Sequence, residues 1–304
     1  MNPAYLLLSF AMVLVNAAFA LAQPAKFDVC PRDADGFAAV QRRAEANDAA
    51  AQTALASCYD LGQHVQPDGK QSIHWLTEAA GQGYAQAQYE LGRIYLYGRG
   101  VPADYDKALL WERKAADQGD ARAQRDLAFM YERGLGVSAD PAQAAEWNRK
   151  AANQGHPEAQ LQLAKALDHA TGVKEDAGEA RQWYAKAARQ EQPAAQLELA
   201  RESADQGNCP VAVHWYEEAA GHGEAQAMYE LGKLYLNRCG PNKDLAFTWF
   251  TIGARFGLRE SKAEADKLVS MLSAARKKRD QLRVAEWIKE HPGSDKEEDK
   301  EEKR

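Results

Sequence analysis

The sequence predicts an all-α protein, a right-handed α-solenoid of about six stacked helix-turn-helix repeats with N- and C-terminal capping helices. Three observations predict this fold. Tryptophans recur at positions 75, 111, 147, 183, 215 and 249, with spacings of 36, 36, 36, 32 and 34 residues. An alanine upstream of each tryptophan keeps the same period, and a leucine follows that alanine by four residues. Glycines end most copies. We call the alanines upstream of the tryptophans the anchors: Ala51, Ala87, Ala123, Ala159, Ala195 and Ala227.

Composition agrees with a globular protein and excludes several classes. The chain has 304 residues, of which 45% are hydrophobic and 27% are charged, values that argue against wholesale disorder. Its formal net charge of -6 disfavours general nucleic-acid binding, which needs a positive footprint. Four cysteines are too few for a disulfide-scaffold miniprotein.

The amino terminus predicts export. Residues 5–15 are almost all apolar, and no charged side chain precedes Lys26. Two A-x-A patterns follow, ending at Ala20 and Ala22, so residues 1–22 are expected to be a secretory signal cleaved after one of these alanines. An uncleaved anchor is the alternative. We expect the mature protein to be periplasmic or secreted.

Export makes disulfides possible, because they persist outside the cytosol. Four cysteines allow three pairings, and we expect the local ones, Cys30–Cys58 and Cys209–Cys239. Cys209 and Cys239 lie in the two connections that are shortened in the last two repeats, where equivalent loops of neighbouring units lie side by side. Free thiols are the alternative for this pair.

The elements follow in order. Residues 23–48 are expected to hold an N-terminal segment with a capping helix at 33–46, and residues 49–257 the six repeats. In the second repeat Ala87, Leu91 and Tyr95 share one face of a first helix. Asp104 is the expected N-cap of a second helix that carries Trp111 and ends at Gly119. Stacking of such hairpins buries the tryptophans in a continuous core.

Two capping helices are expected in residues 258–291. Their expected packing residues are Leu268, Leu272, Leu282, Ala285 and Trp287. The basic run 276–279 is interpreted as a solvated outer face of the cap rather than a nucleic-acid patch. Residues 292–304 are rich in both charges and predict a disordered tail.

The repeat pattern identifies a family resemblance. The second copy has the pattern Ala87-x-x-x-Leu91-Gly92-x-x-Tyr95-x-x-Gly98-x-Gly100-Val101-x-x-Asp104-x-x-x-Ala108-x-x-Trp111-x-x-x-Ala115-Ala116-x-x-Gly119 and resembles a Sel-like repeat, a sibling of the tetratricopeptide repeats. The resemblance covers about residues 49–257. It implies a protein-interaction scaffold with adaptor roles in bacterial envelopes, in polysaccharide or peptidoglycan machinery, or in contact with host factors.

The chain carries no catalytic motif that we recognise. Neither G-x-S-x-G, H-E-x-x-H, G-x-x-x-x-G-K-[ST] nor S-x-x-K occurs, and the seven histidines are scattered. We therefore predict no catalytic residue, no metal site and no cofactor. The resemblance still leaves one enzymatic alternative open, because some cysteine-rich relatives bind or slowly hydrolyse β-lactams.

If the first helices line the concave side, as in the tetratricopeptide superfamily, two sets of positions are expected to face a groove. The first set lies two residues after the anchors and the second lies six residues after them. Both sets together have basic and aromatic character, which suits an acidic or carboxylate-ended peptide or an anionic glycan. The alternative is a set of solvated helix faces. The predicted groove residues are Tyr89, Arg93, Arg125, Phe129, Lys165, Arg201, Tyr229 and Lys233.

Overall fold

A computed structural model describes residues 29–291, so the predicted signal segment 1–22 and charged tail 292–304 lie outside the described residues. The described residues form fifteen helices and no strand. The helices are α2 (Ala34–Glu45), α3 (Ala49–Leu61), α4 (Gly69–Gly81), α5 (Ala85–Tyr97), α6 (Tyr105–Asp117), α7 (Ala121–Arg133), α8 (Pro141–Asn153), α9 (Pro157–Asp168), α10 (Ala177–Ala188), α11 (Pro193–Asp205), α12 (Cys209–Gly221), α13 (Ala225–Asn237), α14 (Lys243–Arg255), α15 (Arg259–Val269) and α16 (Ala274–Glu290).

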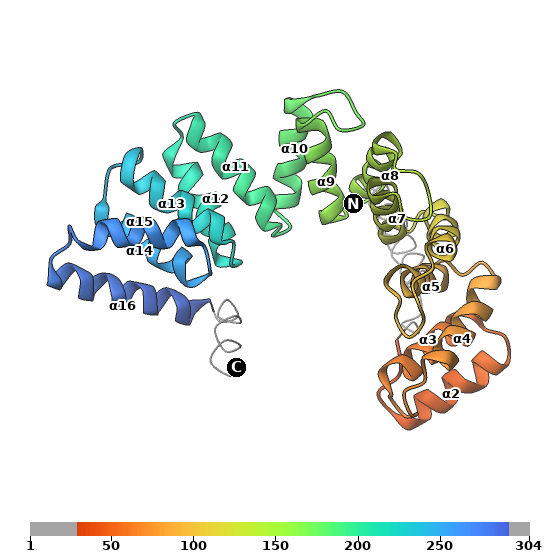
Figure 1. Ribbon diagram of the computed structural model, residues 1–304. Coiled ribbons are helices and arrows are strands. Elements are labelled where there is room, and N and C mark those ends of the chain that lie inside the picture. The colour runs from red at the N-terminus through yellow and green to blue at the C-terminus, as the bar shows by residue number, and fades with distance from the viewer. Residues whose placement is uncertain (1–28, 292–304) are drawn as a thin grey trace, which may run out of the picture. The chain divides into compact units, whose positions relative to one another are not determined.

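The chain divides into two compact units, Met1–Asp120 and Ala121–Arg304. In the first unit, α2 packs on α3, and the helix pairs α3/α4 and α5/α6 form the first two repeats. In the second unit, the pairs α7/α8, α9/α10, α11/α12 and α13/α14 form the other four, and α15 and α16 pack on α14 (Figure 1). Each helix from α2 to α15 packs chiefly on its neighbours along the chain within its unit, which confirms the predicted all-α repeat solenoid.

Local signals position the helices as expected. The second helices of the first four repeats begin after an aspartate whose carboxylate accepts a hydrogen bond from a backbone N–H in the first turn. Asp104 is one of these N-caps. Gly119 has a φ of 92°, a left-handed conformation in which a side chain would be strained, and this explains the glycine at the end of that repeat.

The core of each repeat is built from the anchor alanine, the leucine that follows it and the tryptophan of the second helix. The anchors are fully buried, which lets neighbouring helices approach closely. Trp147, Trp183 and Trp249 are buried, and the other repeat tryptophans are half-buried. The ammonium groups of Lys150 and Lys186 lie 3.6 and 3.7 Å from the ring centroids of Trp147 and Trp183 and cover their outer faces. The predicted role of the tryptophans in the core is confirmed.

A buried glutamine follows the anchor alanine in each of the first five repeats and was missed at the level of sequence. In the first four repeats its side-chain oxygen accepts a hydrogen bond of 2.7–2.8 Å from a second glutamine at the end of the same repeat. Its nitrogen also donates to a backbone carbonyl of the preceding helix, for example from Gln88 to Ala80 and from Gln160 to Ala152. These bonds satisfy polar groups at the repeat junctions that would otherwise be buried without partners.

The fifth repeat breaks this pattern. Gln196 is 1% exposed and donates to the carbonyl of Ala188, but among the described residues its side-chain oxygen has no hydrogen-bond partner. His222 stands where the earlier repeats have the second glutamine, seven residues after the tryptophan. A buried acceptor left unpaired costs about 1–3 kcal/mol.

Replacing His222 by glutamine is therefore expected to stabilise the protein. The new side chain restores the missing donor to Gln196, a gain of about 1 kcal/mol in the free energy of unfolding. Thermal and urea unfolding measure the effect. The His222→Leu variant, which supplies no donor, is the control and should not gain stability. Equal stability of the glutamine and leucine variants would contradict the account.

The C-terminal cap differs in part from the prediction. Two capping helices are present, as expected, and Leu268 and Leu272 are buried. Leu282 and Ala285, which we expected to pack, are exposed, and Val284 is buried in their place. The prediction was wrong because most residues of α16 are polar. Its few apolar residues do not show which side of the helix packs on α14.

Both predicted cysteine pairs form disulfides, with Cα–Cα distances of 4.9 Å for Cys30–Cys58 and 5.6 Å for Cys209–Cys239. Disulfides favour an oxidising, non-cytoplasmic compartment. Among residues 29–291 no helix combines the length and the apolar character that a membrane crossing requires.

Candidate functional site

Three pockets open at the same place in the repeat pattern. Each pocket is lined by the side chain that directly follows a repeat tryptophan. Residues from the first helices of two successive repeats complete the lining. In the first unit the pocket lies between α3, α4 and α5 and has a volume of about 250 Å³. In the second unit one lies between α7, α8 and α9, with about 250 Å³, and another between α11, α12 and α13, with about 410 Å³.

The pocket between α11, α12 and α13, which we call the fifth–sixth pocket, has the densest set of charges. Arg201 of α11, Lys233 of α13 and Arg238, the C-cap of α13, supply three cations. Asp205 and Glu230 supply two carboxylates. The lining thus carries a net charge of one positive unit and can hold an anionic group close to several donors.

The cations of this pocket are held in ion pairs that leave them accessible. Arg201 Nη1 lies 2.9 Å from Glu198 Oε1, and Lys233 Nζ lies 2.9 Å from Glu230 Oε2. Both cationic side chains are about two-fifths exposed or more. Exposed pairs of this kind contribute about 0–1 kcal/mol each, so an incoming anion can compete with the protein's own carboxylates.

Tyr216 lines the same pocket and is buried. Burial raises the pKa of its hydroxyl, and the negative charge of Glu230 raises it further. The hydroxyl therefore keeps its proton at physiological pH.

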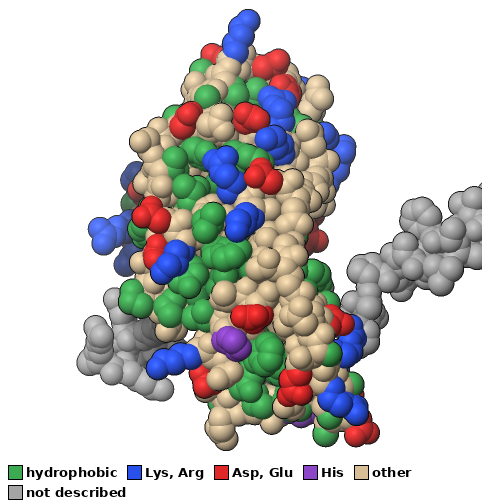
Figure 2. Space-filling view, turned by 90° about the vertical axis from the view of Figure 1, so that its right-hand side faces the viewer, with side chains coloured by type: hydrophobic (Ala, Val, Ile, Leu, Met, Phe, Trp, Pro, Cys, Tyr) green, Lys and Arg blue, Asp and Glu red, His purple; other side chains and the backbone are tan. Residues whose placement is uncertain are grey.

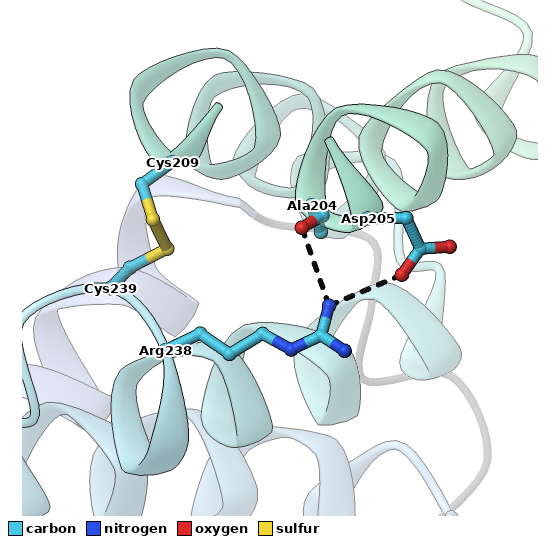
Figure 3. The surroundings of a disulfide bond; sticks show 5 residues. All are labelled: Ala204, Asp205, Cys209, Arg238 and Cys239. Carbon is cyan, nitrogen blue, oxygen red and sulfur yellow. Dashed lines mark hydrogen bonds and ion pairs between the residues drawn. A yellow bond between two sulfur atoms is a disulfide. The ribbon is translucent and has the colours of Figure 1, made fainter. Parts of the chain in front are cut away.

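A disulfide fixes the position of Arg238. Cys239 follows Arg238 directly and is bonded to Cys209, the first residue of α12 (Figure 3). From this position the Arg238 guanidinium donates to the carbonyl oxygen of Ala204 at 3.3 Å and to Asp205 at 3.1 Å, both at the end of α11. The bonds close one wall of the pocket and give the Ala204 carbonyl a side-chain donor in addition to the backbone N–H of Gly207, which lies 3.1 Å from it.

Comparison with known proteins identifies the repeats. A family model described as Sel1 repeat matches residues 49–84, 85–120, 121–156, 157–191, 193–224 and 225–255. These six segments cover more than half of the chain. The chain belongs to the Sel1 repeat family. Sel1 repeats typically form scaffolds for protein–protein interaction and are generally not catalytic.

Two solved structures share the Sel1-repeat fold with this chain. One is c5321, a protective antigen present in uropathogenic Escherichia coli strains that displays an SLR fold, with 30% identity and a TM-score of 0.72. The match covers 83% of this chain and 55% of that chain, so our protein spans about half the length of the antigen. The other is a Sel1 repeat protein from Oxalobacter formigenes, with 31% identity, a TM-score of 0.60 and coverage of 69% and 89%. No match was found among curated proteins.

The predicted groove positions two residues after the Sel1-repeat anchors are mostly not exposed. Tyr89 is 6% exposed, the Arg125 side chain is 12% exposed, and Tyr229 is half-buried. The corresponding Thr53, Leu161 and Leu197 are also buried. The expected exposure was wrong, and these residues belong to the packing inside each unit.

The predicted positions six residues after the Sel1-repeat anchors are more accessible. Lys233 is exposed, and the others are half-buried: Arg93, Phe129, Lys165 and Arg201. Arg93 contacts the hydroxyl of Tyr89 at 3.3 Å, whereas Arg201 and Lys233 reach the fifth–sixth pocket. Lys165 lies in the pocket between α8 and α9.

The groove is less basic than predicted. Acidic residues lie three positions after the anchors of four Sel1 repeats, at Glu90, Asp126, Glu198 and Glu230, and the last two pair with the predicted cations. On the face of the molecule that Figure 2 shows, Lys and Arg side chains also lie among Asp and Glu side chains. The acidic positions follow the repeat period and were therefore detectable from the sequence.

Sequence reasoning also missed Tyr216, Arg238 and Asn148. Tyr216 and Asn148 directly follow a repeat tryptophan, and side chains at this place reach the pockets between Sel1 repeats. Among residues 29–291 no group of three or more histidine, cysteine or acidic side chains is placed to hold a metal ion.

Proposed function

We propose that this chain is an exported interaction scaffold that binds an extended acidic or carboxylate-ended peptide segment of a partner protein. Its main contact is the fifth–sixth pocket. One observation carries this proposal: Arg201, Lys233 and Arg238 line a single pocket of about 410 Å³ that Tyr216 also lines.

The energetics favour an anionic ligand group at this place. A carboxylate that enters the pocket can replace Glu198 and Glu230 as the partner of Arg201 and Lys233 at modest cost, because the two cationic side chains are 40% and 46% exposed. It also gains a hydrogen bond from the neutral Tyr216 hydroxyl. Hydrogen bonds to charged groups contribute about 1.5–3 kcal/mol each.

The N-terminal sequence and the disulfides support export to a bacterial envelope or secretion from the cell. The N-terminal segment 1–22 has the pattern of a secretory signal, and two disulfides suit an oxidising compartment. The similar E. coli protein is a protective antigen. We therefore place the partner in the envelope, its assembly machinery or a host.

The proposal is tested with a labelled peptide, acetyl-Ala-Ala-Glu-Glu-Ala amide, and its counterpart with two glutamines in place of the glutamates. Fluorescence anisotropy should show that the acidic peptide binds at least about tenfold more tightly, the effect of one charge-assisted hydrogen bond. The Arg201→Gln/Lys233→Gln variant should lose this preference.

The matched control is Lys243→Gln/Lys262→Gln, which removes the same charge from exposed lysines of α14 and α15 that do not line the pocket. It should retain the affinity of the unmodified protein. Equal binding of both peptides, or an equal loss in the pocket variant and the control, would refute binding at the fifth–sixth pocket.

A further inference from the structure

A second pocket in the same unit holds a buried acceptor without a partner. This pocket, which we call the third–fourth pocket, is walled by small residues of α8, including Ala144 and Ala145, and by Lys165 and Ala166 of α9. A Cβ on Gly172 would lie 2.1 Å from the carbonyl oxygen of Pro141, so the loop after α9 packs tightly on the start of α8. The pocket is thus a built part of the junction between the third and fourth repeats.

Asn148 lines this pocket and is 2% exposed. Its side-chain nitrogen donates to Glu132 Oε1 at 2.9 Å. Because an ionised carboxylate only accepts hydrogen bonds, this bond fixes the orientation of the amide and leaves Asn148 Oδ1 as an acceptor. Among the described residues this oxygen has no hydrogen-bond partner. Because buried polar atoms are normally hydrogen-bonded, we expect a bound ligand to supply the missing donor.

Lys165 supplies the complementary group. It occupies the same repeat position as Arg201 and Lys233, but the residue three positions before it is the neutral Gln162 rather than a glutamate. Lys165 accordingly has no ion pair among the described residues. The pocket therefore offers one unused cation beside one unused acceptor.

The structure assigns this pocket a ligand with both an N–H donor and an anionic group, and we propose that it is the backbone amide and the acidic side chain of an extended peptide. The amide N–H donates to Asn148 Oδ1, and the carboxylate binds Lys165. The inference rests on the proposed function, because it adds a second contact for a partner segment in the unit that holds the fifth–sixth pocket. It differs from that contact in recognising the peptide backbone.

The test uses isotope-labelled full-length protein and acetyl-Ala-Glu-Ala amide as the probe. Three analogues each carry an ester oxygen in place of one backbone N–H, and a fourth carries glutamine in place of glutamate. NMR titration follows the side-chain amide of Asn148 and the backbone amide of Lys165. We expect saturable shifts at both residues, and one ester analogue should bind about tenfold more weakly, the effect of one lost hydrogen bond to a buried acceptor.

Two variants make the test specific. Asn148→Leu should bind the parent peptide and that ester analogue equally well, and Lys165→Met should bind the glutamate and glutamine peptides equally well. Leucine is tolerated at this place of the repeat, because Leu76 occupies it in the first repeat and is buried there. Circular dichroism and the melting temperature confirm that each variant is folded.

The outcomes separate the two proposals. Shifts at Tyr216 and Lys233 without any at Asn148 would overturn this inference and leave the fifth–sixth pocket in place. Shifts at Asn148 alone would support the third–fourth pocket and count against the other. Equal loss for every ester analogue, or unchanged discrimination by Asn148→Leu, would refute recognition of the backbone. Absence of shifts at both pockets would refute both.

Discussion

A variant in which Cys209 and Cys239 are both serine is expected to lose about 3–4 kcal/mol of unfolding free energy, since the bridge closes a loop with a sequence separation of 30 residues. The loss arises mainly from the greater chain entropy of the unfolded state. Urea unfolding followed by tryptophan fluorescence measures it. Both cysteines are replaced so that no single thiol is left to form a wrong bridge.

The second disulfide provides a matched control. Cys30–Cys58 has a separation of 28 residues, so its removal should cost a similar free energy. Only the Cys209/Cys239 variant should also bind the acidic peptide more weakly, because Arg238 then loses the neighbouring constraint that holds it against Ala204 and Asp205. Equal affinity in the two serine variants would show that the bridge does not shape the fifth–sixth pocket.

A Gly232→Ala variant is expected to be destabilised by about 2–3 kcal/mol, because overpacking a rigid core is costly. A Cβ at this position would lie 2.5–2.9 Å from three ring carbons of Phe250, which is fully buried. Because protein cores are closely packed, a buried ring can move away only by displacing its neighbours. This cost exceeds the helix-propensity gain of about 1 kcal/mol that alanine brings over glycine. Thermal unfolding gives the measurement.

The first repeat supplies the compensating change. There Ala56 and Leu76 occupy the places of Gly232 and Phe250, and both are buried in one cluster. In the double variant Gly232→Ala/Phe250→Leu, the smaller side chain makes room for the added methyl group. The double variant should be more stable than the sum of the two single changes predicts, with a coupling of about 1–3 kcal/mol. Additive effects would mean that the two positions do not compete for the same space.

Much of the fold could be predicted because the repeat period carries strong local signals. Tryptophan and alanine spacing gave the helix pairs, Asp104 marked a helix start, and cysteines in shortened connections indicated a disulfide. Each of these features depends on residues close in sequence or on strict periodicity. The resemblance to a known repeat family rested on the same positions.

The candidate site was harder to predict because it depends on how successive helices rotate against one another. Periodicity shows that Tyr89 and Arg93 lie on one helix face, but not that the neighbouring helices bury Tyr89. The partners of Arg201 and Lys233 lie three residues away on the same helices. They were missed because they belong to neither of the two sets of predicted groove positions. Asn148 reaches its pocket from a second helix, which no pattern of first-helix residues could show.

The paired glutamines have a consequence for how this protein can change in length. Each of the first four modules pairs its buried glutamine with a second glutamine of the same module, so a duplicated module would carry both the donor and the acceptor with it. The sixth module has the apolar Met228 and Phe256 at the two glutamine places and therefore lacks this pair. Duplication of a glutamine-bearing module would therefore leave no buried glutamine oxygen without a donor.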